Sequence, residues 1–232
     1  MTLTFDGTEL TAAYNCYAFR DKTDNTPARD GEGIEVSGRS GNLFDDKKRW
    51  PNVDLSYILL FNSESDFDGC KAFLASKVGY KVLSDSEHPS EFYKALLNGE
   101  ISPTIDRQRG LFKFIARFNR KPQRYLTTGN AVTSLTASGS ITNPTLFDSQ
   151  PLFRVYGNGT LGVGAYSLTI TNSNVYTDID SEMQDCFKGS TSMNNYVTLT
   201  GHKFPLLVPG SNGITLGTGI TKVEITPRWY TI

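Results

Sequence analysis

The sequence has few of the residues on which catalysis and covalent cross-linking usually depend. Its 232 residues include two histidines and three cysteines. Histidine is the commonest general acid or base, yet neither His88 nor His202 is accompanied by a nucleophile motif such as GxSxG. Cys16, Cys70 and Cys186 are odd in number, far apart and without a CxxC pair, which excludes a disulfide framework and a zinc-ligand spacing. We therefore predict three buried free thiols in a protein that is not an enzyme and has no cofactor.

The sequence also lacks an excess of charge and a long apolar run. The formal net charge is -1 and the isoelectric point about 6.1, so there is no basic field to hold a phosphate backbone. No run of 18 apolar residues occurs, and the N-terminus lacks the basic and apolar regions of a signal peptide. We expect no nucleic-acid partner and no membrane span in a soluble chain made in a cytoplasm.

The residue composition of the sequence changes near residue 127. Residues 1–127 hold 18 Lys or Arg and 18 Asp or Glu, whereas residues 128–232 hold 5 and 6. The second part is rich in Gly, Thr, Ser and Asn, the composition of short strands linked by turns. We predict two domains, residues 1–127 and residues 128–232, with the last strand as a candidate for packing back on the first domain.

The first part contains one helical pattern among strands. Ser65 begins a capping-box pattern with Asp68, and apolar residues then recur with helical spacing up to Leu74, before Gly79 as a C-terminal cap. Alternation predicts strands at residues 53–61 and 111–118, whereas residues 92–97 fit a strand or a helix. The polar stretch 23–33 predicts a long loop or arm.

The second part reads as strands throughout, with the spacing of a β-sandwich. The predicted strands are residues 151–156, 166–171, 175–179, 196–200, 213–216 and 220–226. Residues 157–162 match the GxGxxG pattern, but an alternating strand follows where a dinucleotide site needs a helix. We interpret them as a glycine-rich hairpin connection.

An acidic cluster in the second part is the best candidate for a cation site. Asp178, Asp180 and Glu182 offer oxygen ligands, but no glycine provides the tight loop of an EF-hand. Carboxylates at i and i+2 leave a strand on one face, so a solvated edge or a turn cap is the simpler interpretation. We predict no bound metal, with these three residues as the weak candidates.

Four segments of the second part resemble the distal tail protein (Dit) family of siphovirus-type bacteriophages. Phe204–Ile214 resembles the family's FP-x-L-x-PG-x-N-x-I pattern with slightly altered spacing, and Gly219–Trp229 resembles its last strand and closing PRW. Tyr176–Glu182 is similar to its strand and turn with an acidic pair, and Pro151–Gly159 to the strand that opens its second domain. The C-terminal stretch, Phe204–Trp229, is the strongest match.

The first part resembles the same family more loosely. Val36–Gly41 is similar to an I-P-G-R-x-G turn, with Ser37 in place of the proline. The helix, an aliphatic strand, the phenylalanine-rich strand and Asn119–Pro122 then follow the family's order. The resemblance therefore covers nearly the whole chain.

The resemblance implies a mostly β fold: an N-terminal β domain with one packed α-helix, and a C-terminal galectin-like or carbohydrate-module-like β-sandwich. It implies a ring, typically a hexamer, formed by the N-terminal domains as the hub of a phage tail tip. The expected partners are other copies of the chain, the tail tube protein and the tail-associated or baseplate proteins that adsorb to the host. A host cell-surface glycan is a further candidate. The implied location is the virion tail tip, after assembly in the cytoplasm of the host bacterium.

A charge run provides candidates for an assembly interface. The run spans residues 45–51, in which charged residues are followed by the aromatic Trp50. Its simplest interpretation is a solvated hairpin tip. Exposed Trp and Arg side chains are also the residues that contribute most to interfaces. We therefore take Arg39, Lys47, Arg49 and Trp50 as the interface candidates.

Two other classes of function are weighed against a tail hub. A non-enzymatic carbohydrate-binding module would stack Trp229 or Tyr230 on a sugar ring, although an alternating run that ends the chain favours packing on a sheet. A cell-wall hydrolase would need paired carboxylates across a cleft, or a metal with histidine ligands. The sequence offers neither arrangement, so the hub is the preferred interpretation.

Overall fold

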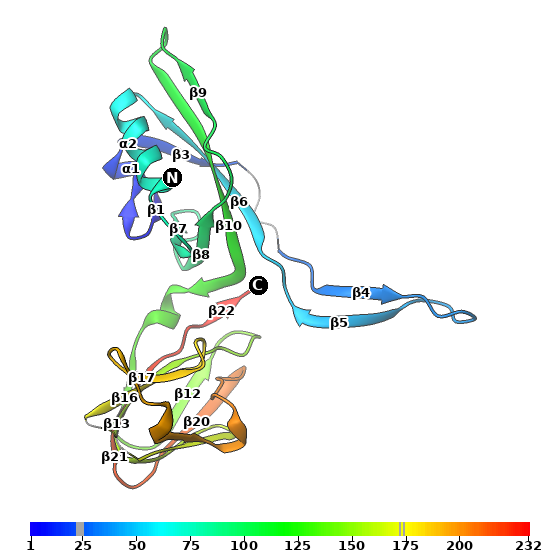
Figure 1. Ribbon diagram of the computed structural model, residues 1–232, viewed down its shortest axis with the longest axis vertical. Helices are drawn as coiled ribbons and strands as arrows, with labels where there is room; N and C mark the ends of the chain where they lie inside the picture. Colours follow the sequence, from blue (N-terminus) through cyan, green and yellow to red (C-terminus); the bar gives the residue numbers. More distant parts are fainter. Residues whose placement is uncertain (22–25, 172, 174) are drawn as a thin grey trace. The chain divides into compact units, whose positions relative to one another are not determined.

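The protein, seen in a computed structural model that describes residues 1–21, 26–171, 173 and 175–232, divides into two compact units (Figure 1). The first unit is Met1–Arg124 together with Ile232, and the second is Tyr125–Thr231. The predicted boundary after residue 127 lies a few residues further along the chain. Strands dominate both units, as the sequence predicts. Among the described residues, no helix is long and apolar enough to cross a bilayer.

The first unit is built on one large sheet with the strand order β2-β1-β7-β8-β10-β6-β3, and β9 pairs with the first residues of β10. The expected strands at residues 53–61 and 111–118 are present, and residues 92–97 are a strand rather than a helix. The elements of the sheet and its helices are β1 (Leu3–Phe5), β2 (Thr8–Glu9), α1 (Leu10–Ala13), β3 (Cys16–Arg20), β6 (Val53–Phe61), α2 (Glu64–Ala75), β7 (Lys81–Asp85), β8 (Glu91–Leu97), β9 (Pro103–Asp106) and β10 (Leu111–Leu126).

Helix α2 is capped two residues before the predicted position. Its N-cap is Ser63, whose hydroxyl accepts a hydrogen bond from the backbone N–H of Asp66 at 3.4 Å. Ser65 lies exposed in the first turn. The helix ends at Ala75, and Gly79, with φ +73°, belongs to the loop that follows. The predicted cap was wrong because Ser63 and Ser65 both offer a hydroxyl before the helical pattern, and Ser63 is the one with an extended backbone, φ -133° and ψ 135°.

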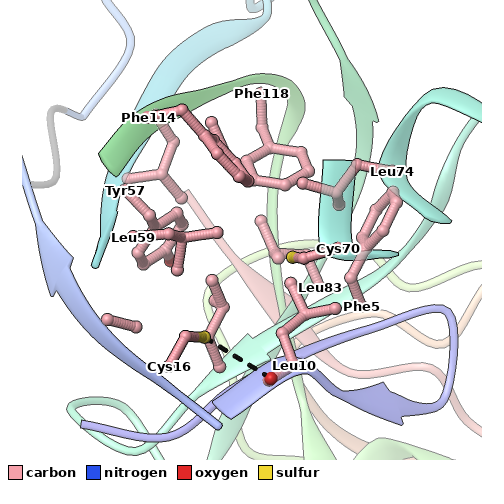
Figure 2. Packing of buried hydrophobic residues seen from close by; sticks show 14 of the residues in the cluster. Phe5, Leu10, Cys16, Tyr57, Leu59, Cys70, Leu74, Leu83, Phe114 and Phe118 are labelled. Carbon is pink, nitrogen blue, oxygen red and sulfur yellow. Dashed lines mark hydrogen bonds between the residues drawn. The ribbon is translucent and has the colours of Figure 1, made fainter. Parts of the chain in front are cut away.

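The core of the first unit lies between the sheet and α2 (Figure 2). Phe67, Cys70 and Leu74 are the buried face of the helix, at the spacing that the sequence indicates. They contact the inward side chains of β6 and β10, including Phe61 and Phe114, whose ring centroids lie 5.3 Å apart. Burial of aromatic and aliphatic side chains in this cluster is the main stabilisation of the unit.

All three thiols are buried and unpaired, as predicted. Cys16 donates to the carbonyl of Leu10 at 3.5 Å (Figure 2). Burial raises the pKa of Cys16 to about 11 and that of Cys186 to about 12. A thiol with a raised pKa is a poor nucleophile at neutral pH, so these cysteines serve packing.

Strands β4 (Asp30–Ile34) and β5 (Leu43–Arg49) form a separate two-stranded sheet (Figure 1). The charge run 45–49 therefore lies in a strand, and the hairpin turn is at residues 35–42, so the predicted position of the tip was wrong. Residues 30–33 of the predicted loop belong to β4, while residues 23–25 lie outside the described part of the chain. The cross-strand pairing of Ile34 with Leu43 fixes this register.

The second unit contains two sheets, of order β11-β21-β13-β16-β17-β18 and β12-β20-β14-β15-β19. Its elements are η1 (Thr127–Asn130), β11 (Thr133–Leu135), β12 (Gly139–Asn143), β13 (Leu152–Gly157), β14 (Gly159–Val163), β15 (Tyr166–Ile170), β16 (Tyr176–Asp180), β17 (Asp185–Lys188), β18 (Thr191–Ser192), η2 (Asn194–Tyr196), β19 (Val197–Leu199), η3 (Thr200–His202), β20 (Gly210–Leu216), β21 (Ile220–Thr226) and β22 (Tyr230–Thr231).

The two sheets of the second unit enclose a common core and so form the predicted sandwich. Phe153 and Ile225 come from one sheet, and Leu161 and Ile214 from the other, and all four belong to one buried cluster. Trp229 is 5% exposed and lies in the same cluster. It therefore has no free face for a sugar, which excludes the stacking that a carbohydrate module would require of it.

The first residues of the glycine-rich segment 157–162 connect the two sheets, because β13 ends at Gly157 and β14 begins at Gly159. Strand β13 pairs with β16 and β21, whereas β14 pairs with β15 and β20, so the segment crosses between sheets and the predicted hairpin was wrong. Gly157 has φ +97°, and a Cβ there would lie 2.1 Å from the carbonyl oxygen of Gly219. The close approach of two backbones requires glycine at this position.

Candidate assembly surfaces

The predicted interface residues all lie in or beside the β4–β5 hairpin. Arg49 Nε lies 2.6 Å from Asp30, and Arg29 Nε lies 2.8 Å from both carboxylate oxygens of Asp46. Lys47 Nζ lies 3.9 Å from the same Asp30. The hydrogen bonds from Arg29 hold the pKa of Asp46 below its ordinary value. Much of the charge in the run is therefore paired across the hairpin.

Trp50 and Arg39 differ in how freely they are displayed. The guanidinium of Arg29 lies 4.7 Å from the ring centroid of Trp50, which is half-buried. Arg39 is exposed in the turn between β4 and β5, where its N–H donates to the carbonyl of Val36 at 3.1 Å. Of these two candidates, Arg39 is the one that offers a free side-chain surface.

The hairpin also exposes apolar side chains that are not among the predicted interface residues. Ile34, Val36, Leu43 and Phe44 are all exposed, Phe44 by 61%. The ring of Phe44 lies over Gly31, where an added Cβ would come within 2.2 Å of Cζ. Leu43 and Phe44 are successive residues of β5, so these four side chains lie on both faces of the hairpin, and we call them together the hairpin patch. An isolated two-stranded hairpin is marginally stable in water, so a hairpin with an apolar surface indicates a binding partner.

A second apolar surface lies on the face of the large sheet opposite to its core. Tyr17 and Phe19 on β3 are 61% and 49% exposed, and they pair across to Leu60 and Ile58 on β6. Ile115 on β10 is in turn opposite Ile58. We call these five residues the sheet patch. Strand β3 also ends the strand order of the sheet. Alternation in residues 16–20 could have indicated this surface, but it does not tell which face meets the core.

The acidic cluster of the second unit is engaged by arginines. Asp178 accepts two hydrogen bonds from Arg154, at 2.7 and 2.9 Å, and Asp180 accepts two from Arg228, at 2.7 and 2.8 Å. Glu182 lies 3.5 Å from Arg228. Both aspartates are buried, which contradicts the solvated edge, whereas the turn cap is correct for Asp180.

Asp180 shows how the turn is fixed. Its Oδ1 accepts the backbone N–H groups of Glu182 and Met183, at 2.9 and 3.0 Å. Burial raises the pKa of Asp180, but the Arg228 guanidinium and these N–H groups outweigh burial and hold it below the ordinary value. The oxygens that a cation would need are already used, so the cluster is a structural feature of the turn and of the closing PRW segment.

A buried ion pair in the first unit joins β3, β6 and β7. Asp85 has a fully buried side chain and contacts Arg20 Nη2 at 2.5 Å and the hydroxyl of Tyr57 at 2.6 Å. Its other oxygen accepts the N–H groups of Glu87 and His88, at 3.0 and 3.2 Å. Burial raises the pKa of Asp85, but these hydrogen bonds outweigh it and lower the pKa.

The two histidines lie apart from any nucleophile motif. His88 Nδ1 is 3.8 Å from Asp85, whose oxygens are already engaged. Asp85, Glu87 and His88 come close enough together to hold a metal ion, but Arg20 already supplies the positive charge there, 3.6 Å from Glu87. His202 is exposed at the end of η3.

The folds of the two units define a class of protein: a helix-covered sheet with a two-stranded hairpin, followed along the chain by a β-sandwich. No protein-family model matches the sequence, and no curated protein matches it. The crystal structure of the SPP1 Dit (gp 19.1) protein superposes with a TM-score of 0.72 at 15% identity, over 100% of this chain and 99% of that chain. That protein is described as a paradigm of the hub adsorption apparatus in phages that infect Gram-positive bacteria.

Two structures of the phage P2 baseplate in its activated conformation match as well. The structure with Ca gives a TM-score of 0.56, covering 94% of this chain and 91% of that chain, and the structure with Sr gives 0.53, covering 97% and 95%. Both are 12% identical in sequence. This chain therefore has the fold of the distal tail hub proteins, as its resemblance to that family predicts.

Proposed function

We propose that the chain is a non-catalytic hub protein of a phage tail tip, which forms a ring through its first unit. Its fold is similar over the whole chain to a Dit hub protein and to chains of a phage baseplate. The ring would join the tail tube to the tail-tip or baseplate proteins that adsorb to the host. The resemblance to the Dit family implies six copies in this ring.

The observation that carries the proposal is the hairpin patch. Its exposed apolar side chains stand on a two-stranded sheet that pairs with no other strand among the described residues. Such a hairpin gains stability when a partner covers it. We propose that the partner is the sheet patch of the next copy.

A ring requires two different complementary surfaces on each copy, because a heterologous contact closes by rotation. The hairpin patch and the sheet patch meet this requirement on one chain. In this arrangement the charged candidates Arg39, Lys47 and Arg49 border the contact and set its register, since rim charges contribute more to specificity than to affinity.

Light scattering after size-exclusion chromatography tests the proposal. At micromolar concentration the 25.6 kDa chain should run as a particle several times that mass. Phe44→Ser in the hairpin patch and Phe19→Ser in the sheet patch should each lower the mass towards the monomer, because each removes an apolar contact of about 2 kcal/mol from every interface of the ring.

Val78→Ser is the matched control. Val78 is 86% exposed and lies in neither patch, so its loss should leave the ring unchanged. Circular dichroism should show that all three variants keep the fold. A wild-type chain that is monomeric at every concentration would overturn the ring. A ring that survives both Phe44→Ser and Phe19→Ser would overturn the two surfaces assigned to it.

A further inference from the structure

Three asparagines of the chain are followed directly by glycine: Asn98, Asn158 and Asn212. An asparagine in this position can react with its own backbone. The backbone nitrogen of the next residue attacks the side-chain amide carbon, and a glycine, which has no Cβ, obstructs this approach least. The reaction is intramolecular, so its rate depends on how freely the two groups reach an attacking geometry. The structure gives this freedom to the three asparagines unequally.

Asn212 is held by its own side chain. It is 2% exposed and lies in β20, between β12 and β14. Its side-chain oxygen accepts the N–H of Val208 at 2.9 Å, and its amide donates to the carbonyls of Val208 and Gly210 at 2.8 and 2.9 Å. These hydrogen bonds must break, and the strand must open locally, before the amide carbon can meet the nitrogen of Gly213.

Asn158 is held by the backbone around it. Its side-chain oxygen accepts the N–H of Ser173 at 2.5 Å. The glycines on its two sides both lie against the backbone of residues 218–219, where an added Cβ on Gly159 would come within 2.4 Å of the carbonyl oxygen of Thr218. The backbone rotation that brings the reacting groups together is therefore opposed by a closely packed neighbouring segment.

Asn98 is free of both constraints. It is exposed in the loop between β8 and β9, and its side chain makes no hydrogen bond to the described part of the chain. Gly99 has φ +85°, and an added Cβ there would have no atom within 4 Å. The backbone N–H of Asn98 donates to the carbonyl of Arg117 at 2.8 Å, which fixes the start of the loop without engaging the side chain.

We propose that Asn98 is a site of spontaneous deamidation. The backbone nitrogen of Gly99 loses its proton to hydroxide and attacks Cγ of Asn98, so that a bond forms between these two atoms. The bond from Cγ to Nδ2 breaks, and ammonia leaves with a proton taken from water. Water then opens the resulting cyclic succinimide at one of its two carbonyls. The product is aspartate or isoaspartate, with nothing oxidised or reduced.

The modification changes the charge of an exposed loop. The new carboxylate is ionised at neutral pH, since the ordinary pKa of aspartate is about 3.9. It adds one negative charge to a chain whose formal net charge is -1. Asn98 belongs to neither the hairpin patch nor the sheet patch, so the site does not rest on the proposed ring.

Peptide mapping by mass spectrometry tests the site. The folded full-length chain and the same chain unfolded in guanidinium chloride are incubated in alkaline buffer, sampled over time and digested. In the folded chain, the peptide with Asn98 should gain the mass difference between an amide and a carboxyl group at least tenfold faster than the peptides with Asn158 and Asn212. In the unfolded chain the three rates should be comparable, because each asparagine precedes a glycine.

The matched control is Asn98→Gln, whose longer side chain has to close a larger and less favourable ring. It should abolish the mass change at this position and leave the rates at Asn158 and Asn212 unchanged, while circular dichroism shows the same fold. A folded wild type that stays unmodified at Asn98 while the unfolded chain is modified there would overturn the proposal. Equal rates at the three asparagines of the folded chain would overturn it as well.

Discussion

At the scale of single residues, two buried aspartates hold segments together that lie far apart in the chain. Asp180 joins the turn after β16 to Arg228 in the last segment. Asp85 joins the end of β7 to Arg20 on β3 and Tyr57 on β6. A buried carboxylate is tolerated only where donors replace the water that it loses, and in both cases several donors do so.

Replacing Asp85 by asparagine should destabilise the first unit by about 3 kcal/mol, because the buried guanidinium of Arg20 would lose its buried counter-charge and keep only the more exposed Glu87, 3.6 Å away. Chemical denaturation followed by circular dichroism measures this change. Asp45→Asn, on the exposed face of the hairpin, should change the free energy of unfolding by less than about 0.5 kcal/mol.

The same carboxylate predicts a dependence on pH. Because the pKa of Asp85 is lowered in the folded state, its contribution to stability is present above the unfolded pKa of about 3.9 and is lost as pH falls through the folded pKa. The free energy of unfolding of the wild type should therefore fall below about pH 4. The slope should be smaller for Asp85→Asn, and equal slopes for the two proteins would contradict this account.

At the scale of elements, helix α2 depends on a cap that the structure identifies. Ser63→Ala removes the side-chain acceptor for the N–H of Asp66 and should cost about 0.5–1 kcal/mol. Ser65→Ala, at the exposed position two residues later, should leave stability unchanged or raise it by a few tenths of a kcal/mol, because alanine is a better helix former than serine. Urea denaturation of the two variants compares them directly. A larger loss of stability for Ser65→Ala than for Ser63→Ala would instead identify Ser65 as the cap, as the sequence pattern predicts.

The β4–β5 hairpin is the other element with a specific consequence. Its charges pair across its own strands, while its apolar side chains remain exposed. The sequence predicts an interface of charged residues and Trp50, whereas the structure leaves the apolar side chains of the hairpin as its free surface. The reason is that ion pairs between exposed side chains contribute little, whereas uncovered apolar area favours association.

At the scale of the whole molecule, the paired charges and the exposed apolar side chains of the hairpin predict how the ring responds to salt. If the two apolar patches carry the contact, the particle mass measured by light scattering should persist at about 1 M NaCl, where the Debye length is about 3 Å and exposed ion pairs are screened. Arg39→Ala, at an exposed charged position of the same hairpin, should change the mass less than Phe44→Ser does. Dissociation of the wild-type ring by salt alone would instead assign the contact to the charged candidates.

The sequence by itself determined the local features of this protein. Alternation placed the strands of both units, the spacing of Phe67, Cys70 and Leu74 gave the buried face of α2, and isolated cysteines indicated buried thiols. These features depend on residues close together in the chain, where backbone periodicity decides which side chains share a face. The resemblance of the last segment to the Dit family likewise gave the fold.

Only the tertiary structure decided the features that join distant segments. The pairing of Asp180 with Arg228, the crossing of residues 157–159 between sheets and the exposure of Tyr17 and Phe19 all depend on which strands become neighbours. Alternation gives two faces to a strand, but the arrangement of the other strands selects the face that is buried.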